Sequence, residues 1–224
     1  MKIIKPSVQI MTPLNQAEIL AHIERCGRTC YKSEDKITED SAEKFVRNLI
    51  KRGHESVLEH YSFTVRFICD RGVSHELVRH RIASYSQEST RYCNYGNDVV
   101  FILPCYLEEA ARIVEENKSR SLFEMPKEAQ LFSDWRVAMR FTESIYKDML
   151  KLGATPQEAR AVLPNSLKTE VVSTMNLRQW RHVIKQRIAP AAHPQIREVM
   201  EMLLEELREK LPVVFEDIVK GGDS

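Results

Sequence analysis

The segment 61–69 alternates in side-chain character at a period of two, more regularly than any other part of the chain. Phe63, Val65, Phe67 and Cys69 fall on one side, against Thr64, Arg66 and Ile68 on the other. Because successive side chains of an extended chain point to opposite faces, this pattern is typical of a strand with one buried face. The patterns on both sides of it have helical spacing, so the chain must combine strand and helices.

Apolar residues at helical spacing predict most of the other elements. Residues 155–158 read Thr-Pro-Gln-Glu, a capping box with proline at the first helical position. Ser74 is expected to cap a helix running through Arg79, after a turn at 70–72. Short strands are predicted at 99–103 and 171–174. The remaining predicted helices are 15–28, 38–52, 107–119, 133–152, 176–188 and 194–210.

Length and composition indicate one globular domain. The chain has 224 residues, of which 43% are hydrophobic, so it can bury a substantial core. It contains no internal repeat, low-complexity segment or flexible linker. We therefore expect a single α+β domain over 1–224, with a small, mainly antiparallel sheet surrounded by helices. Residues 220–224 are expected to be loose.

Charge and cysteine content narrow the function classes. The net charge is +1, so the excess of basic residues that non-specific nucleic-acid binding needs is missing. No apolar run approaches the roughly 20 residues needed to span a bilayer. The N-terminus lacks the apolar core of a signal peptide. Five scattered cysteines argue for a reducing compartment, so we expect a cytoplasmic protein with no membrane or nucleic-acid partner.

Two clusters of histidine, cysteine and glutamate residues could in principle bind a metal ion. His22, Cys26 and Cys30 are each four residues apart, so a helix would align them, yet no fourth ligand follows at a recognisable spacing. The group His54, Glu55, Glu59 and His60 lacks the two-histidine spacing of the usual zinc helix. We therefore predict no metal site.

The run 79–92 gathers the residues that best suit an anion. It holds three arginines, a histidine, serines and tyrosines, and an arginine fork donates two parallel hydrogen bonds to phosphate or carboxylate. In a loop, the Ser89 hydroxyl, the Thr90 backbone and the Arg91 guanidinium can converge on a phosphate. The alternative is a solvated polar face. On a helix Arg79 and Arg81 would point about 160° apart and would serve two ligands or two subunits.

The spacing within this run resembles a family signature. Arg79-His80-Arg81, seven residues, Ser89 and then Arg91 resemble the signature of the flavin-dependent thymidylate synthases. The segments 51–56 with Glu59-His60, 158–164, and Asn176-Leu177-Arg178 followed by His182, Arg187 and His193 also resemble that family in order and spacing. The resemblance covers about 30–193.

This resemblance implies reductive methylation of dUMP to dTMP. Methylenetetrahydrofolate would supply the carbon, NADPH would reduce FAD, and the reduced flavin would supply the hydride. It also implies a homotetramer with active sites shared between subunits.

The resemblance assigns site residues position by position. Arg187 is implied to be catalytic, by contacting the uracil ring and stabilising charge that develops on it. The implied FAD contacts are His54, Ser56, Arg79, His80, Arg81, Gln87, Asn176, Arg178, His182 and His193. The implied dUMP contacts are Glu76, Arg79, Gln87, Glu88, Ser89, Thr90, Arg91, Arg160 and Arg187.

Some positions depart from the family pattern. Gln87 stands where glutamate is common, Glu76 where glutamine is common, and the segment 189–192 before His193 is longer. Two alternatives stay open: a flavin-dependent NADPH oxidoreductase that methylates nothing, and a nucleotide-binding regulatory protein that binds no flavin.

Overall fold

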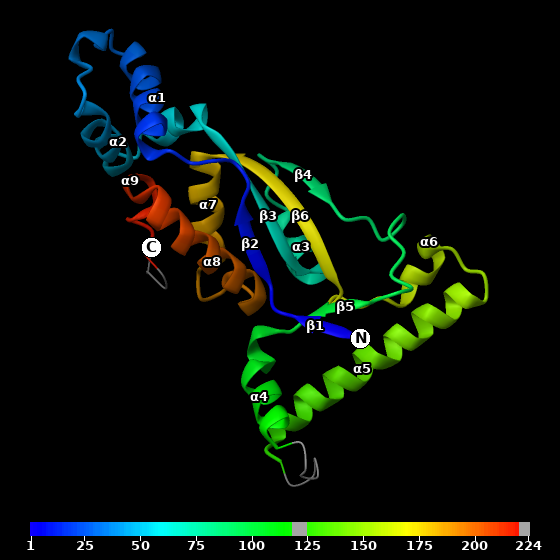
Figure 1. Ribbon diagram of the computed structural model, residues 1–224. Coiled ribbons are helices and arrows are strands. Elements are labelled where there is room, and N and C mark those ends of the chain that lie inside the picture. The colour runs from blue at the N-terminus through cyan, green and yellow to red at the C-terminus, as the bar shows by residue number, and fades with distance from the viewer. Residues whose placement is uncertain (118–124, 220–224) are drawn as a thin grey trace. The chain divides into compact units, whose positions relative to one another are not determined.

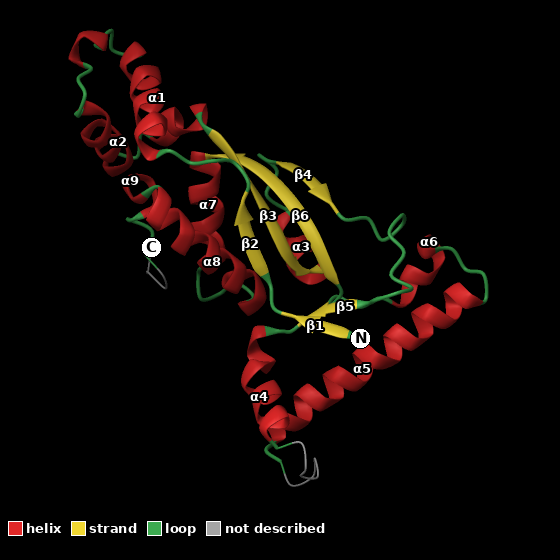
Figure 2. Cartoon of the chain, in the orientation of Figure 1, coloured by secondary structure: helices red, strands yellow, loops and turns green. Residues whose placement is uncertain are grey.

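The computed structural model describes residues 1–117 and 125–219 (Figure 1). The chain forms two compact units. Unit 1 comprises Met1–Ser7, Ile68–Leu77 and Gln87–Val171, and unit 2 comprises Val8–Phe67, Val78–Ser86 and Val172–Ser224. The chain contains both helices and strands (Figure 2), and each unit includes some of both, so the expected α+β class with a small antiparallel sheet is confirmed.

Four strands form the main sheet in the order β2-β3-β6-β4, with bounds Ser7–Ile10, Ser62–Asp70, Lys168–Asn176 and Ser84–Gln87. β3 and β6 run antiparallel: the Leu177 amide donates to the Tyr61 carbonyl, and the Arg71 amide to the Leu167 carbonyl. The alternating segment is therefore a strand, as predicted. The predicted strand at 171–174 extends further in both directions.

A second, two-stranded sheet pairs β1 (Lys2–Ile4) with β5 (Val100–Ile102) in parallel, with Lys2 opposite Val100. The strand at β5 is predicted by the sequence, whereas β1 and β2 are too short to show a period. These strands, with the helices α4 (Glu108–Glu116), α5 (Lys127–Lys151) and α6 (Pro156–Ala159), belong to unit 1. Its core packs Phe101, Met139 and Tyr146 together.

Unit 2 is built around the helix α7 (Leu177–Arg187). Trp180 is fully buried, stacks on Phe63 of β3 with ring centroids 5.2 Å apart, and donates its indole N–H to the Phe63 carbonyl. The predicted apolar stripe of this helix is confirmed as core. The other helices of the unit are α1 (Gln16–Thr29), α2 (Ser41–Lys51), α8 (Pro194–Lys210) and α9 (Pro212–Phe215), with the 3-10 helix η2 (Glu55–His60).

The predicted helix start at Ser74 is wrong. Helix α3 spans Arg71–Leu77, so it begins earlier and also ends before Arg79. The Asp70 carboxylate accepts a hydrogen bond from the Val73 amide at 2.7 Å, whereas the Ser74 hydroxyl donates to the Arg71 carbonyl inside the helix. Aspartate satisfies a first-turn amide as well as serine does, and the Asp-Arg-Gly sequence is therefore a helix start rather than a turn.

Other boundaries differ less. Within the polar run 79–92, for which no strand is predicted, Ser84–Gln87 forms the edge strand β4. The long helix α5 begins at Lys127, before the predicted 133, and the capping box of Thr155 and Glu158 is confirmed ahead of α6. The predicted end of the helix at 107–119 and the predicted loose tail at 220–224 lie outside the described residues. Within the described ranges, no helix has both the length and the apolar character to cross a bilayer.

The chain offers a direct test of the predicted single domain. Because β3, β4 and β6 each contribute residues to both units, we expect one cooperative unfolding transition. Trp135 belongs to unit 1 and Trp180 to unit 2, and they are the only tryptophans in the sequence. Urea unfolding of Trp135→Phe and Trp180→Phe, followed by fluorescence and circular dichroism, should give coincident midpoints within each variant. Separate midpoints for the two probes would indicate independent domains.

Candidate functional site

A tight turn follows strand β4 at the predicted phosphate segment. The amides of Tyr92 and Cys93 both donate to the Ser89 carbonyl, and the Arg91 amide donates to the Ser89 hydroxyl oxygen at 3.3 Å. The Arg91 side chain donates from Nε to Gln157 Oε1 at 2.8 Å. The structure thus confirms a loop at 89–91 and ties it to the capped start of α6.

A cavity of about 240 Å³ opens beside this turn in unit 1. Its polar lining consists of Arg71, His75, Thr90, Arg160 and Asn165, and none of the described residues that line it is acidic. Arg160 donates from Nη1 to the Thr90 hydroxyl at 3.3 Å, so the two predicted residues do meet. Two guanidinium groups and a hydroxyl around a small cavity suit an oxyanion.

Arg71 and His75 line this cavity but are not among the residues predicted for the site. Both lie on α3, whose start was misplaced, so their position beside Thr90 was not foreseen. If Asp70 is taken as the residue that caps α3, both Arg71 and His75 fall within the first one and a half turns of that helix. Arg71 also donates from Nη1 to the Glu88 carbonyl at 3.4 Å, which anchors the strand end that leads into the turn.

Glu88 is held in a network inside unit 1. Its carboxylate accepts from Lys168 at 2.9 Å and from the Tyr95 hydroxyl at 2.8 Å, and Lys168 also pairs with Glu170 at 2.6 Å. Burial, and then the hydrogen bond to Glu88, raise the pKa of Tyr95. Burial opposes the charge of Lys168, but its two carboxylate partners raise its pKa above the ordinary value. These contacts hold Glu88, the residue that directly precedes the turn at 89–91, in a fixed position.

Gln87 and Glu76 are both half-buried in unit 1. The Gln87 amide nitrogen donates to the Ser74 hydroxyl at 2.9 Å and to the Thr169 hydroxyl at 3.3 Å. An uncharged amide suits these two hydroxyl acceptors, because a carboxylate at this position has no hydrogen to donate.

The Arg-His-Arg segment lies beyond the end of α3, in unit 2. Arg79 and Arg81 are exposed, whereas His80 is only 7% exposed. Arg79 and Arg81 do not lie on a helix, because α3 ends at Leu77, so the separation of about 160° expected for two helical side chains does not apply to them. His80 contacts Arg187, the last residue of α7, whose Nε donates to His80 Nε2 at 2.9 Å.

The pKa of His80 is lowered from 6.5 to about 4, chiefly by burial and then by the charges of Arg187 and His182. A neutral imidazole is what the geometry demands, since its Nε2 must accept the hydrogen bond from Arg187.

A larger cavity of about 830 Å³ lies in unit 2 between α1, α2 and η2. Three predicted residues line it: His54, Ser56 and Arg178. Arg28, Lys36 and Arg52 add further positive charge, and among the described residues no acidic side chain lines this cavity. Its apolar wall consists of Phe45, Leu49, Val57 and Gly27.

The apolar wall depends on a glycine. A Cβ built on Gly27 would meet the Phe45 ring at 2.7 Å, so only glycine allows α1 and α2 to approach this closely here. Arg28 lies over the same ring, 4.6 Å from its centroid, and the exposed Arg178 pairs with Glu59 at 2.5 Å.

Two of the remaining predicted contacts, Asn176 and His193, cap helices, and the third, His182, lies within α7. Asn176 caps α7 by accepting from the Gln179 amide at 2.8 Å, and His193 caps α8 by accepting from the Gln195 amide at 3.3 Å. His182 is exposed on α7. These caps explain why Asn176 and His193 suit the local structure, since each satisfies a backbone amide in the first turn of its helix.

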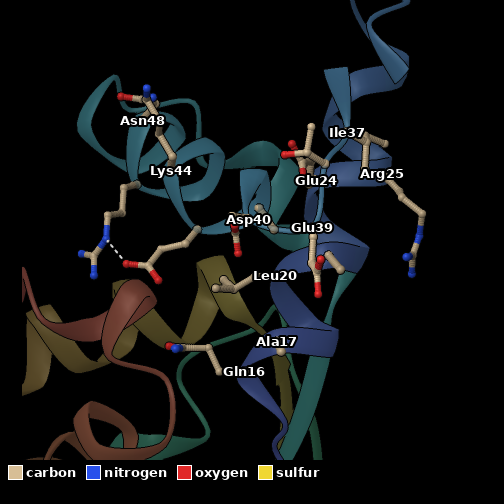
Figure 3. Close-up of a pocket in the computed structure, with 15 residues that line it drawn as sticks. Gln16, Ala17, Leu20, Glu24, Arg25, Ile37, Glu39, Asp40, Lys44 and Asn48 are labelled. Atoms are coloured by element: carbon tan, nitrogen blue, oxygen red, sulfur yellow. Dashed lines mark hydrogen bonds and ion pairs between the residues drawn. The ribbon is translucent and has the colours of Figure 1, made fainter. Parts of the chain in front are cut away.

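A third cavity, of about 620 Å³, lies between α1 and α2 and contains none of the predicted residues (Figure 3). Acidic side chains such as Glu24 and Glu39 alternate in its lining with basic ones such as Lys44, so its charge favours no one ligand class. Within the part of the chain that the structure describes, no group of histidine, cysteine and acidic residues could hold a metal ion. Cys26 contacts His22 at 3.7 Å instead.

Comparison with known proteins decides the family. The family described as thymidylate synthase complementing protein matches residues 14–213. The chain belongs to this family. A relative from Pyrococcus furiosus, named flavin-dependent thymidylate synthase, is 36% identical over 199 residues, which cover 88% of this chain and 75% of the relative. One of the same name from Corynebacterium efficiens is 35% identical over 218 residues, 94% of this chain and 83% of that one. The chain is therefore an enzyme.

Solved structures give the same fold. A UMP/dUMP methylase, PolB from Streptomyces cacaoi, bound with 5-bromo-dUMP, matches with a TM-score of 0.75 over 96% of both chains at 23% identity. The resemblance read from the Arg-His-Arg segment is thus confirmed at the level of family and fold.

Proposed function

We propose that this enzyme methylates dUMP to dTMP, with methylenetetrahydrofolate as the carbon donor and NADPH as the reductant of a bound FAD. The observation that carries the proposal is the cation-lined cavity at the Ser89–Arg91 turn, where Arg160 and Thr90 meet. It suits the phosphate of a nucleotide. The relatives named flavin-dependent thymidylate synthase and the methylase bound with a dUMP analogue support the substrate class.

The larger cavity fits a dinucleotide cofactor. Its volume of about 830 Å³ falls within the range of ligand sites, and its acid-free lining suits a pyrophosphate. Arg178, His54 and Ser56 would hold the cofactor there, with Lys36 and Arg52 available for its phosphates. When bound, the flavin supplies the hydride that completes the new methyl group.

Arg187 is the residue we assign to the chemical step. A guanidinium fixed near the uracil ring stabilises the negative charge that develops as the ring carbon becomes nucleophilic. In this chain the fixing is provided by the end of α7 and by the hydrogen bond to His80.

We also propose that the working form is a cytoplasmic homotetramer with shared active sites. Helix α5 exposes Leu131, Val137 and Phe141, each at least 60% accessible. Large exposed apolar side chains on one helix support burial against another copy.

The decisive experiment is dTMP formation from dUMP by the purified protein supplied with FAD, NADPH and methylenetetrahydrofolate. Folate-dependent dTMP is the expected result. NADPH consumption by a yellow protein without dTMP would indicate a flavin oxidoreductase. A colourless protein that binds dUMP would indicate a nucleotide-binding regulatory protein.

A substitution of Arg79 tests whether this one residue binds both dUMP and FAD. We expect Arg79→Ala to weaken both dUMP and FAD binding by about tenfold each, because an exposed guanidinium that contacts two anionic ligands contributes about 1–2 kcal/mol to each. Titration calorimetry for dUMP and flavin fluorescence for FAD measure the two affinities. Unchanged values for both would remove Arg79 from the site.

A further inference from the structure

The hydrogen bond between His80 and Arg187 joins two segments of unit 2 that are far apart in sequence. His80 follows α3, and Arg187 is the last residue of α7. Because no further helical turn follows Arg187, its side chain has no neighbour from the same helix on the C-terminal side. A long, flexible side chain at a helix end needs a second fixed point to keep one orientation. His80 Nε2, at 2.9 Å from Arg187 Nε, provides that point.

The residue that carries the imidazole is buried and its backbone is anchored. His80 is 7% exposed, and its backbone carbonyl accepts a hydrogen bond from the Tyr85 hydroxyl on β4 at 2.9 Å. The titratable and charged groups that act on it are Arg187 and His182, both from α7, and neither carries negative charge. Burial and the charges of these two groups all disfavour a second proton on the ring.

We propose, resting on the function above, that His80 is a positioning residue: as a neutral hydrogen-bond acceptor it fixes the guanidinium of Arg187 for its contact with the uracil ring. This role differs from the FAD contact that the sequence resemblance implies for His80. It requires the proton on Nδ1 and a bare Nε2, because an N–H at Nε2 would face the N–H of Arg187.

The tautomer can be measured without substrate or activity. In long-range nitrogen–proton NMR spectra of the histidine-labelled protein, His80 should show an unprotonated Nε2 from pH 7 down to about pH 5. Comparison with His80→Gln assigns the signal. A protonated Nε2, or an imidazole that titrates at the ordinary histidine value, would overturn the proposal even if dTMP is formed. A correct tautomer in a protein that forms no dTMP would count against the proposed function alone.

The functional link is tested by a double-mutant cycle on dUMP affinity. His80→Leu removes the acceptor, and His80→Gln keeps an amide oxygen that reaches the place of Nε2. We expect His80→Leu to weaken dUMP binding about tenfold in the wild-type background and less than twofold in the Arg187→Ala background. His80→Gln should restore most of the affinity. Equal losses in both backgrounds would show that His80 acts independently of Arg187.

The cofactor affinity separates the positioning role from a direct FAD contact. We expect the Kd for FAD, measured by flavin fluorescence, to change less than threefold in His80→Leu, while kcat at saturating FAD falls about 30-fold. A large rise in the Kd for FAD with an unchanged kcat would refute the positioning role.

Discussion

Arg187→Ala is expected to lower kcat for dTMP formation by about 10³-fold while FAD binding persists. Removing one fixed charge or donor that acts on the developing negative charge of a reacting group costs about 10²–10³-fold, and the change also removes the partner of His80. FAD should remain bound because the acid-free cavity that fits it is lined by other residues. Turnover assays and the flavin absorbance of the purified variant measure the two effects. Loss of the flavin absorbance would contradict the role assigned to Arg187.

Lys185→Ala is the matched control. Lys185 lies one half-turn earlier on α7, is also basic, and is 48% exposed, 3.8 Å from Asp217. Its removal changes the net charge by the same amount and at nearly the same place. We expect kcat within about twofold of the wild type, because an exposed pair of this kind contributes little. An equal loss in both variants would mean that general charge, rather than the position of Arg187, governs turnover.

Arg181→Leu is expected to lower the free energy of unfolding by about 3 kcal/mol. The Arg181 side chain is 1% exposed and donates to both Asp217 oxygens at 2.7 Å, to Glu55 at 3.0 Å and to the Val214 carbonyl. Without it, Glu55 and Asp217 lose their shared cation in a partly buried place. Urea unfolding of the flavin-free protein measures the change, with the slope expected to remain constant.

Arg47→Leu provides the comparison. Arg47 also bridges two carboxylates, Glu43 and Glu216, but all three side chains are at least 40% exposed. We expect a loss below about 1 kcal/mol, since solvent screens such pairs. A loss as large as that of Arg181→Leu would show that burial is not what makes the Arg181 network strong.

The same network predicts a pH dependence. Burial opposes the charge of Asp217, but its hydrogen bonds and ion pair with Arg181 lower its pKa below 3.8. A depressed carboxyl pKa stabilises the folded state above the unfolded value, and this stabilisation is lost as the pH falls from 3.8 through the folded pKa. The acid-induced loss of stability should therefore be smaller in Arg181→Leu.

Arg181 also shows what sequence reasoning left out. Glu55 lies between His54 and Ser56, which line the larger cavity, so the buried network positions the segment that carries two predicted FAD contacts. An arginine within an otherwise amphipathic helix reads as a surface residue. Its partners stand 126 and 36 residues away in sequence, and no local pattern indicates such distances.

Elements with strong local signals can be predicted from the amino-acid sequence alone. The period of two gave β3, the apolar stripe gave α7 with its core Trp180, and the capping box gave the start of α6. These follow from interactions within a few residues, which a sequence displays directly. The order and spacing of the Arg-His-Arg segment also sufficed to indicate the family.

Which of these residues contact one another is known only from the folded chain. It paired Arg160 with Thr90, added Arg71 and His75 to their cavity, and joined His80 to Arg187. The short strands β1 and β2 also become evident only in the folded chain, because they are too short to be stable alone. Each is stabilised by backbone hydrogen bonds to a strand distant in sequence, β5 for β1 and β3 for β2. Contacts of this kind depend on how separate elements pack, and packing is a property of the whole fold rather than of any segment.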